Sequence, residues 1–447
     1  MIVGSSDNYR NHQPRPLNLE YFIARKVAAS GQKSFSRLII RIAITAVALS
    51  VAVMIIATAL IAGFKYEISN KIFGFWGHIH ITDTDINRSL LDAYPIKKNQ
   101  KFYPSLDTIR KIAYLDQTEV GGVYYEQMRT TNGGVDHIQV FAMIPVIVKG
   151  KKDIEGIVLK GISDDFEWKY MDQFMVEGER IVLPDSSASK DIIISQQTAR
   201  RLDVKIGDNF DVVFVRKNEQ LRRRFVISGI YKTGLEEYDK RFALVDIRQL
   251  QRLLGWTENE VGGFEVFIDD IDDLSTIVDY IYYDQLPNDL NAEGIKKKLP
   301  EIFDWLELQD INEIVILSLM VIVAIINMVT ALMILILERT NMIGTLKAMG
   351  SSNWSIRKVF LYYAAYIVII GLFWGNLFGI GICVLQDQLE IIRLSEENYY
   401  LSVAPIKMNF WTILGINTGT LITTVLFLVI PSYLVSSISP VKAIRFK

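Results

Sequence analysis

The sequence is poor in the residues on which many enzymes and metal sites depend. Its 447 residues include one cysteine, Cys383, and four histidines, His12, His78, His80 and His137. A single cysteine excludes a disulfide within the chain. His78 and His80 share one face of a predicted strand, but no third ligand is evident nearby, so we predict no metal site. No motif of the type G-x-S-x-G, H-E-x-x-H or G-x-x-x-x-G-K-[ST] occurs. We therefore expect no catalytic site and no ATP-binding site in this chain.

Charged residues are also missing from four long apolar stretches. Residues 42–64, 314–337, 359–386 and 408–441 contain no Asp, Glu, Lys or Arg. About 20 apolar residues cross the hydrocarbon core of a bilayer, so each stretch is long enough for a membrane-spanning helix. Proton and ion relays need titratable groups at membrane depth, and these spans therefore argue against such a relay.

The uneven spacing of these stretches defines the predicted fold class. One span precedes a polar stretch that is long enough to bury a core of its own, and three spans follow it. We predict a membrane protein with four transmembrane α-helices (1+3) and a large α+β extracytoplasmic domain inserted between helices 1 and 2. The predicted segments are a cytoplasmic amphipathic segment (1–41), span 1 (42–64), the α+β domain in two lobes (65–310), span 2 (311–337), a cytoplasmic coupling loop (338–358), span 3 (359–386), a short periplasmic loop (387–409), span 4 (410–435) and a cytoplasmic tail (436–447).

The charges outside the spans predict the orientation. Residues 1–41 hold seven Lys or Arg against two acids, whereas residues 65–310 hold 42 acids against 32 bases. Short basic loops remain in the cytoplasm. We therefore expect both termini in the cytoplasm and the large domain outside the inner membrane, which in a Gram-negative bacterium is the periplasm. Residues 17–41 form either an amphipathic helix on the inner leaflet or a plain basic flank.

Local patterns predict the elements of the large domain. Strands are expected at residues 76–82, 138–148, 157–161, 210–215, 225–231, 242–245 and 264–268. Helices are expected at residues 105–113, 196–202, 247–254 and 272–283, with a stalk helix at 299–312. Ser195 is the expected N-cap of the second of these helices. The run Arg222-Arg223-Arg224 falls in a predicted hairpin turn, residues 216–224.

The sharpest local pattern is ERTNMIGTLKAMG, residues 338–350. Its apolar side chains share one face of a predicted short helix between two spans: Met342, Ile343, Leu346 and Met349. Lys347 lies opposite, Gly350 suits the left-handed position that ends a helix, and Ser351 or Ser352 can cap the next one. The apolar face needs a partner, which is either the lipid headgroups or a groove on a cytoplasmic protein.

This segment resembles the coupling segment of the MacB/FtsX-like ABC permease superfamily, E-R-x-x-E-I-G-x-x-[RK]-A-x-G. The matching residues are Glu338, Arg339, Ile343, Gly344, Lys347, Ala348 and Gly350, while Met342 replaces the usual acid. The ending PSYLVSSISPVKAIRFK is similar to the superfamily's tail, and IISQQTARRLDVKIGDNFDVVF to its outer domain. The start, FIARKVAASGQKSFSRLIIRIAI, is similar to the lipoprotein-releasing (LolC/LolE-type) branch.

The resemblance implies a permease that pairs with a second permease, either the same chain or a paralogue. It also implies a cytoplasmic ABC ATPase dimer that binds ATP and Mg²⁺. The implied ATPase-docking residues are Glu338, Arg339, Met342, Ile343, Gly344, Leu346, Lys347, Ala348 and Gly350. No cofactor in this chain and no nucleic acid are expected.

The resemblance further implies extraction of lipoproteins from the outer leaflet and their delivery to a periplasmic lipoprotein carrier. The four spans are expected to contact membrane lipid. An apolar lipoprotein cavity is expected at Met54, Ala57, Ile61, Met320, Val323 and Asn327. The carrier contact is expected at Arg216, Arg222, Arg223 and Arg224, although the hairpin that holds them is short, which favours a LolE-like subunit or a contact elsewhere. Two alternatives stay open, a MacB-like permease that transmits motion for periplasmic export and an FtsX-like regulator of a periplasmic hydrolase.

Overall fold

The computed structural model describes residues 20, 22–24, 34–84, 94–120, 123–149, 154–185, 187–216 and 219–439. The chain divides into two compact units. The helical unit comprises residues 1–64, 307–392 and 404–447, and the sheet unit comprises residues 65–306 and 393–403. Most of the predicted amphipathic segment 1–41, and the tail from residue 440 onward, lie outside the described residues.

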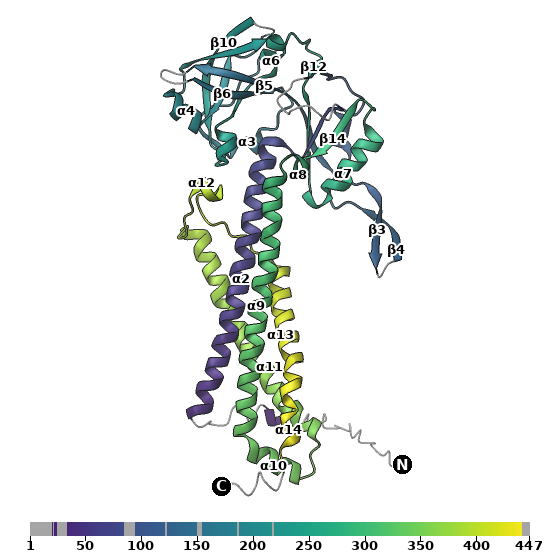
Figure 1. Ribbon diagram of the computed structural model, residues 1–447, viewed down its shortest axis with the longest axis vertical. Helices are drawn as coiled ribbons and strands as arrows, with labels where there is room; N and C mark the ends of the chain where they lie inside the picture. The colour runs from purple at the N-terminus through teal and green to yellow at the C-terminus, as the bar shows by residue number, and fades with distance from the viewer. Residues whose placement is uncertain are drawn as a thin grey trace, which may run out of the picture. The chain divides into compact units, whose positions relative to one another are not determined.

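Four long helices are apolar enough to cross a membrane, and they follow the predicted one-plus-three order (Figure 1). They are α2 (Ser34–Trp76), α9 (Pro300–Glu338), α11 (Asn353–Leu389) and α13 (Phe410–Ser432). Two short helices, α10 (Thr340–Ala348) and α14 (Leu434–Ser437), complete this part. Helix α2 continues past residue 64 because apolar residues still recur at helical spacing, and Ile68, Ile72 and Phe75 are buried.

Three glycines spaced four residues apart allow α2 to pack closely on α11: Gly371, Gly375 and Gly379. A Cβ atom at Gly371 would lie 2.7 Å from Val47 Cγ1, and one at Gly375 would lie 2.8 Å from the Ala48 carbonyl oxygen. Neither position has room for a larger residue without movement of α2. The four-residue spacing of these glycines therefore accounts for the close contact between the two helices.

A pair of asparagines joins α11 to α13. Asn376 Nδ2 donates to Asn417 Oδ1 at 2.6 Å, and Asn417 Nδ2 donates to Asn376 Oδ1 at 2.9 Å. Each amide also donates to a carbonyl of its own helix, of Leu372 and Ile413 respectively. Since lipid offers no hydrogen-bond partners, this reciprocal pairing satisfies both side chains inside the helical unit.

The sheet unit is a mixed α+β domain, as predicted. Its strands are β1 (Ile79–Asp83), β2 (Ile96–Lys97), β3 (Ala113–Val120), β4 (Val123–Thr130), β5 (Val135–Lys149), β6 (Ile154–Ile162), β7 (Met175–Gly178), β8 (Asp191–Ser195), β9 (Asn209–Arg216), β10 (Glu219–Tyr231), β11 (Phe242–Asp246), β12 (Glu260–Val261), β13 (Gly263–Ile268) and β14 (Leu290–Gly294). Its helices are α3 (Trp168–Asp172), α4 (Gln196–Leu202), α5 (Glu236–Asp239), α6 (Ile247–Leu254), α7 (Leu274–Tyr280), α8 (Ile295–Lys298) and α12 (Glu396–Tyr399).

The long strand β5 belongs to two parts of one sheet (Figure 1). Its first half pairs with β13 in the antiparallel order β14-β1-β13-β5. Its second half pairs with β6, and the strands β5, β6, β11, β8, β10 and β9 then close into a barrel because β9 pairs with both β10 and β5. The pairs β6–β11 and β8–β10 are parallel. One hydrophobic core runs through both parts, from Phe264 and Val266 to Ile192 and Val245.

Most predicted elements are confirmed, including the helices at residues 196–202 and 247–254. The Ser195 cap is confirmed as well, since Ser195 Oγ accepts a hydrogen bond from Thr198 N at 3.0 Å. The helix predicted at residues 105–113 is wrong. Only a 3-10 turn, Ser105–Thr108, forms there, and from Ala113 the chain enters β3, which pairs with β4. Cross-strand pairing thus outweighs the helical pattern, and this hairpin was not predicted.

Candidate functional site

Helix α10 turns its apolar face toward the other helices of the helical unit. Ile343 is fully buried in the hydrophobic core of that unit, and Met342 and Leu346 pack partly against it. The expectation that this face contacts lipid headgroups or a cytoplasmic partner is therefore wrong for Ile343, whereas Met349 of the predicted face is exposed. Burial inside the same chain gains about 1.5–3 kcal/mol for a large apolar side chain without the entropic cost of association.

Two cations hold the end of the chain against α10 and α11. Lys347 Nζ donates to the carbonyl oxygens of Ser436, at 3.2 Å, and Ile438, at 2.7 Å. The Arg357 guanidinium lies 3.6 Å from the ring centroid of Tyr433 and donates to Ser436 Oγ. Burial, together with nearby Arg357, lowers the pKa of Lys347. Lys347 thus satisfies carbonyl groups at the C-terminal end of α14, where a positive charge is favourable, while Arg357 contacts a ring and a hydroxyl group of the same segment.

The turn after α10 matches the predicted capping pattern. Gly350 has a φ of +89°, and Ser351 N donates to the Leu346 carbonyl at 3.0 Å. Ser352 Oγ accepts from Ser355 N at 3.2 Å and so caps α11. The glycine is required because other residues rarely adopt this conformation.

The exposed side of this segment forms what we term the coupling surface: Ala348, Met349, Gly350, Ser352 and Trp354. Met349 is 70% exposed and Trp354 is 52% exposed. Glu338 lies at the exposed end of α9, and Arg339, which is half-buried, precedes α10 at its N-cap position. Gly344 is buried beside Ile343. Of the nine residues predicted to dock an ATPase, the structure thus exposes some and uses others to attach α10 to the bundle.

Of the six residues predicted to line a lipoprotein cavity, Met54 belongs to the hydrophobic core of the helical unit and Met320 packs against that core. Met54 is 1% exposed and belongs to the hydrophobic core, so its assignment to a cavity wall is wrong for this chain. Val323 is 41% exposed on α9. The remaining four are half-buried: Ala57, Ile61, Met320 and Asn327.

The arginine run lies in a strand and not in the predicted turn. In β10, Arg222, Arg223 and Arg224 pair with Val213, Val212 and Asp211 of β9, because the two strands continue to Arg216 and Glu219. All three arginines are exposed. Arg224 makes a two-point contact with Asp211 (Nε–Oδ1 2.7 Å, Nη2–Oδ2 3.1 Å), which lowers the pKa of that carboxyl group. The side chain of Arg216 lies outside the described residues.

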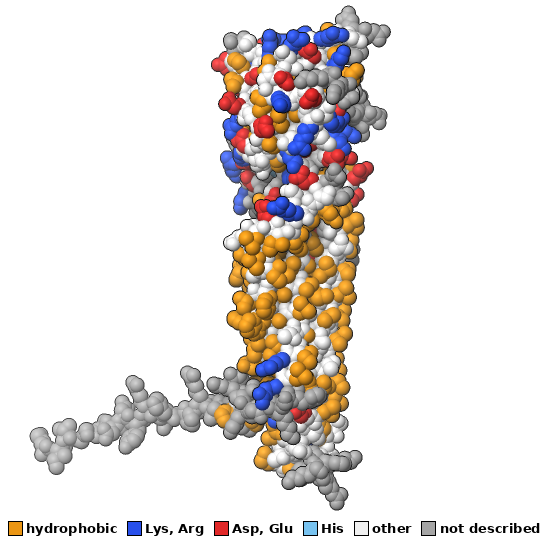
Figure 2. Space-filling model, turned by 90° about the vertical axis from the view of Figure 1, so that its left-hand side faces the viewer, with side chains coloured by type: hydrophobic (Ala, Val, Ile, Leu, Met, Phe, Trp, Pro, Cys, Tyr) orange, Lys and Arg blue, Asp and Glu red, His pale blue; other side chains and the backbone are white. Residues whose placement is uncertain are grey.

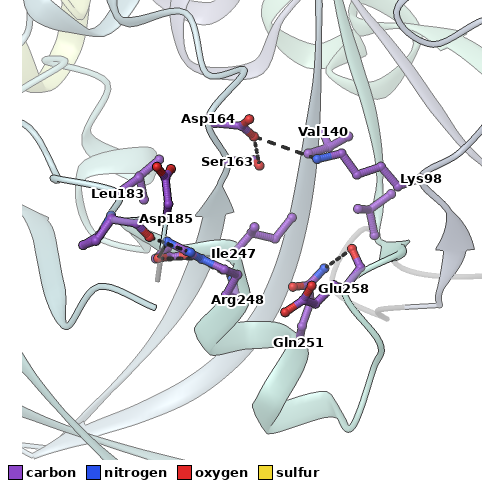
Figure 3. Close-up of a pocket in the computed structure, with 13 residues that line it drawn as sticks. Lys98, Val140, Ser163, Asp164, Leu183, Asp185, Ile247, Arg248, Gln251 and Glu258 are labelled. Carbon is purple, nitrogen blue, oxygen red and sulfur yellow. Dashed lines mark hydrogen bonds and ion pairs between the residues drawn. The ribbon is translucent and has the colours of Figure 1, made fainter. Parts of the chain in front are cut away.

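A polar pocket of about 310 Å³ lies at the carboxyl ends of the parallel strands β6 and β11 (Figure 3). Asp246 caps α6 there, and its carboxylate also holds the Arg248 guanidinium, whose Nη1 donates to the Pro184 carbonyl at 2.8 Å. Lys98 Nζ lies 3.9 Å from Asp164 Oδ1. Although ligands of α/β sheets often bind at such strand ends, the two cations of this pocket are thus already matched by acids of the same chain. Sequence reasoning did not identify this pocket.

A buried ion pair holds the C-terminal end of α2. Lys160 Nζ lies 2.7 Å from Glu265 Oε1 and donates to the carbonyl oxygen of Phe75. Gln139 Nε2 donates to Glu265 Oε2 at 2.8 Å. The Lys160 and Glu265 side chains are 1% and 0% exposed. Charged side chains are rarely buried unless they are paired, and here each of the two charges has the other as its partner. The hydrogen bond from Lys160 to the Phe75 carbonyl then fixes the last turn of α2 to this pair.

The two histidines near this pair bind protein groups. His80 Nε2 donates to the Trp76 carbonyl at 2.6 Å, and its Nδ1 lies 3.1 Å from Lys298 Nζ as the acceptor. Burial lowers the pKa of His80 well below its usual value and that of Lys298 to about 8. His78 Nδ1 accepts from Ile268 N at 3.2 Å. Each ring is thereby engaged in holding the strands and the end of α2.

Comparison with known proteins gives the family. Residues 42–281 match the MacB-like periplasmic core domain, and residues 314–440 match the FtsX-like permease C-terminal family. This chain belongs to the FtsX-like permeases. It is therefore a multi-pass protein of the bacterial inner membrane, its sheet unit is the periplasmic core domain, and it is the transmembrane subunit of an ABC transporter with a partner ATPase.

Full-length relatives place this permease near the LolC and LolE proteins. The lipoprotein-releasing system transmembrane protein LolC of Haemophilus influenzae is 19% identical over 439 residues, which are 97% of this chain and 99% of the relative. LolC of Buchnera aphidicola subsp. Acyrthosiphon pisum is 23% identical over 433 residues, 91% and 93% of the two chains. LolE of Haemophilus influenzae is 18% identical over 452 residues, 96% and 99% of the two chains.

Among solved structures, the extracellular domain of the noncanonic ABC-type transporter YknZ from Gram-positive bacteria is 14% identical. It covers 48% of this permease and 98% of that domain, at a TM-score of 0.29. A similarity at this level supports no conclusion about the permease.

Proposed function

We propose that this permease extracts lipoproteins from the outer leaflet of the inner membrane and passes them to a periplasmic carrier. A cytoplasmic ABC ATPase dimer, which binds ATP and Mg²⁺, drives the cycle. The observation that carries the proposal is the similarity to LolC and LolE along nearly the whole chain. The uncharged spans agree with a lipid-linked cargo, because they offer apolar surface and no ion relay.

The exposed face of α9 is the surface on which acyl chains would lie. Ile314, Leu319, Ile322 and Ile326 are each about half exposed or more, and Val323 lies on the same stretch. Withdrawing an acyl chain from lipid costs about 0.8 kcal/mol per CH₂ group. A second permease that faces α9 would enclose this surface and lower that cost. We place the cargo cavity between two permeases, with α9 as one wall and without Met54.

The coupling surface is the proposed contact with the ATPase. Met349 directly follows α10 and Trp354 lies in the first turn of α11, and both are large, apolar and exposed. Exposed aromatic and Met side chains are the groups that most often anchor protein interfaces. Met349→Ala combined with Trp354→Ala should release the ATPase in detergent while the permease stays folded. The matched control is Thr345→Ala, which alters an exposed position on α10 outside the coupling surface.

The decisive test is lipoprotein release by the reconstituted complex. Proteoliposomes that contain the permease, its ATPase and a labelled lipoprotein are supplied with ATP and the soluble carrier. The proposal expects carrier-bound lipoprotein only when ATP is hydrolysed. ATP hydrolysis without release would refute it, whatever the affinity between permease and ATPase.

The match to the MacB-like core domain favours one alternative function, the transmission of motion for periplasmic export. A permease of that type does not take its cargo from the membrane. Co-purification of a triacylated or diacylated protein with the complex therefore supports lipoprotein release. Co-purification of a periplasmic export protein, without an acylated protein, supports the transmission of motion.

The exposed Arg222 and Arg223 are the proposed contact with the periplasmic carrier, since the Arg224 side chain is held by Asp211.

A further inference from the structure

A pocket of about 230 Å³ lies between α2 and α11 near the N-terminal ends of both helices. Its lining residues come equally from the two helices: Arg37, Ile40, Arg41 and Ile44 from α2, and Tyr363, Tyr366, Ile367 and Ile370 from α11. The spacing of three and four residues places each set on one helix face. The lining thus has two arginines, two phenols, an apolar floor and no acid.

The pocket exists because the close glycine contact ends beside it. At Gly371 the two helices touch, since a Cβ there would meet Val47 at 2.7 Å. About one and two turns nearer the N-termini, the large side chains of Ile367 and Tyr363 take the place of glycine, so the helices cannot stay as close. Ile367 and Tyr363 are buried and form the floor, whereas Tyr366 is 53% exposed at the mouth.

The position of the pocket is the cytoplasmic face of the membrane. The core domain that follows α2 is periplasmic, so the N-terminal end of α2 faces the cytoplasm. Figure 2 shows the hydrophobic side chains of the helical unit as a continuous band with Lys and Arg side chains at its border. Arg41 directly precedes the uncharged stretch 42–64, and Arg37 lies one turn before it, so both lie at the depth of lipid headgroups, where the cytoplasmic leaflet carries anionic lipid.

We propose that this pocket binds an anionic phospholipid, with the phosphodiester on Arg37 and Arg41 and an acyl chain along α11. Guanidinium groups present paired N–H donors that fit phosphate oxygens. The volume suits a headgroup and not a whole lipid. From the mouth, exposed apolar side chains continue along α11 toward the membrane interior, at Ile369 and Phe373. Free phosphate would make no contact with these apolar side chains, whereas the acyl chain of a lipid would cover them. We therefore propose lipid, and not free phosphate, as the ligand.

The test measures lipid retention by the full-length permease and does not depend on lipoprotein release. The protein is reconstituted in nanodiscs of phosphatidylcholine with a minor fraction of phosphatidylglycerol, then extracted into mild detergent, and its bound lipid is measured by native mass spectrometry. The wild type should retain phosphatidylglycerol in preference to phosphatidylcholine. Each arginine replaced by Gln should weaken retention about fivefold, the factor equal to about 1 kcal/mol per cation at the membrane surface.

Lys358→Gln is the matched control, because it removes a cation of the same α11 end outside the pocket lining. Retention should be unchanged in this variant. Equal retention in Arg37→Gln/Arg41→Gln, or no preference of the wild type for phosphatidylglycerol, would overturn the proposal. Complete displacement by inorganic phosphate would overturn it too, since the site would then be one for free phosphate. If the double variant does not fold, Arg41→Gln alone gives the answer, because its side chain is exposed.

Discussion

Removal of the Lys160 ammonium should destabilise the periplasmic core domain strongly. In Lys160→Met the Glu265 carboxylate, which is 0% exposed, loses its cation, and the Phe75 carbonyl at the end of α2 loses a donor. Breaking a buried ion pair by removing one partner costs about 3–5 kcal/mol. For a domain of this size about 2–4 °C of melting temperature corresponds to 1 kcal/mol, so we expect a fall of roughly 10 °C.

The double variant Lys160→Met/Glu265→Gln separates the ion pair from the rest of the contact. It removes the stranded charge but still leaves Phe75 without its donor, so it should be more stable than Lys160→Met and less stable than the wild type. The assay is thermal unfolding of the full-length permease in detergent, followed by tryptophan fluorescence. A single variant as stable as the wild type would refute the view that the pair is both ionised and dry.

The effect should also depend on pH. Burial raises the pKa of Glu265, while Lys160 counteracts this. Without Lys160 the folded state binds the carboxyl proton more tightly than the unfolded state, so its stability rises as pH falls below neutral. The deficit of Lys160→Met should therefore shrink as the pH is lowered toward the raised pKa. A deficit that is constant with pH would show that lost packing, and not a stranded charge, causes the damage.

Three further predictions concern the helical unit, each measured by thermal unfolding of the full-length permease. Gly375→Leu should destabilise it sharply because a Cβ there already lies 2.8 Å from Val51 Cβ, whereas Gly381→Leu, which meets nothing within 4 Å, should be neutral. Asn376→Leu should cost about 0.6 kcal/mol, the usual value of a hydrogen bond between membrane helices, and a neutral result would deny the pairing. Ile343→Ala should cost about 2–5 kcal/mol as a cavity in the core, and an ATPase-binding defect with no loss of stability would contradict its burial.

The sequence was sufficient for features that depend on local or compositional signals. Uncharged stretches predicted the four helices, and Gly350 and Ser352 predicted a turn and a cap that the structure contains. The missed hairpin β3–β4 also had a local signal, because Gly121-Gly122 separates two runs rich in aromatic and β-branched residues. The helix predicted at residues 105–113 ends where the first strand of this hairpin begins.

What could not be predicted depends on which chain segment covers which face. The spacing of Ile343 and its neighbours correctly predicted an amphipathic helix, but spacing alone cannot tell whether the covering surface belongs to the same chain or to another. The same holds for Met54, which is apolar enough for a cavity wall but is buried in the core of the helical unit. Lys160 is an extreme case, because a lone lysine in a strand is normally a solvent-exposed residue and its partner Glu265 lies far along the sequence.

Charge in this permease serves mainly to fix the ends of helices. Lys160 satisfies the Phe75 carbonyl in the last turn of α2, and Lys347 satisfies the Ser436 and Ile438 carbonyls at the end of α14. Such carbonyls have no partner within their own helix and carry the negative end of its dipole. A span without charge cannot hold its own ends, so the cations must come from strands and loops outside the membrane. A substitution at one of these cations should therefore alter how a helix is held, even though no span residue has changed.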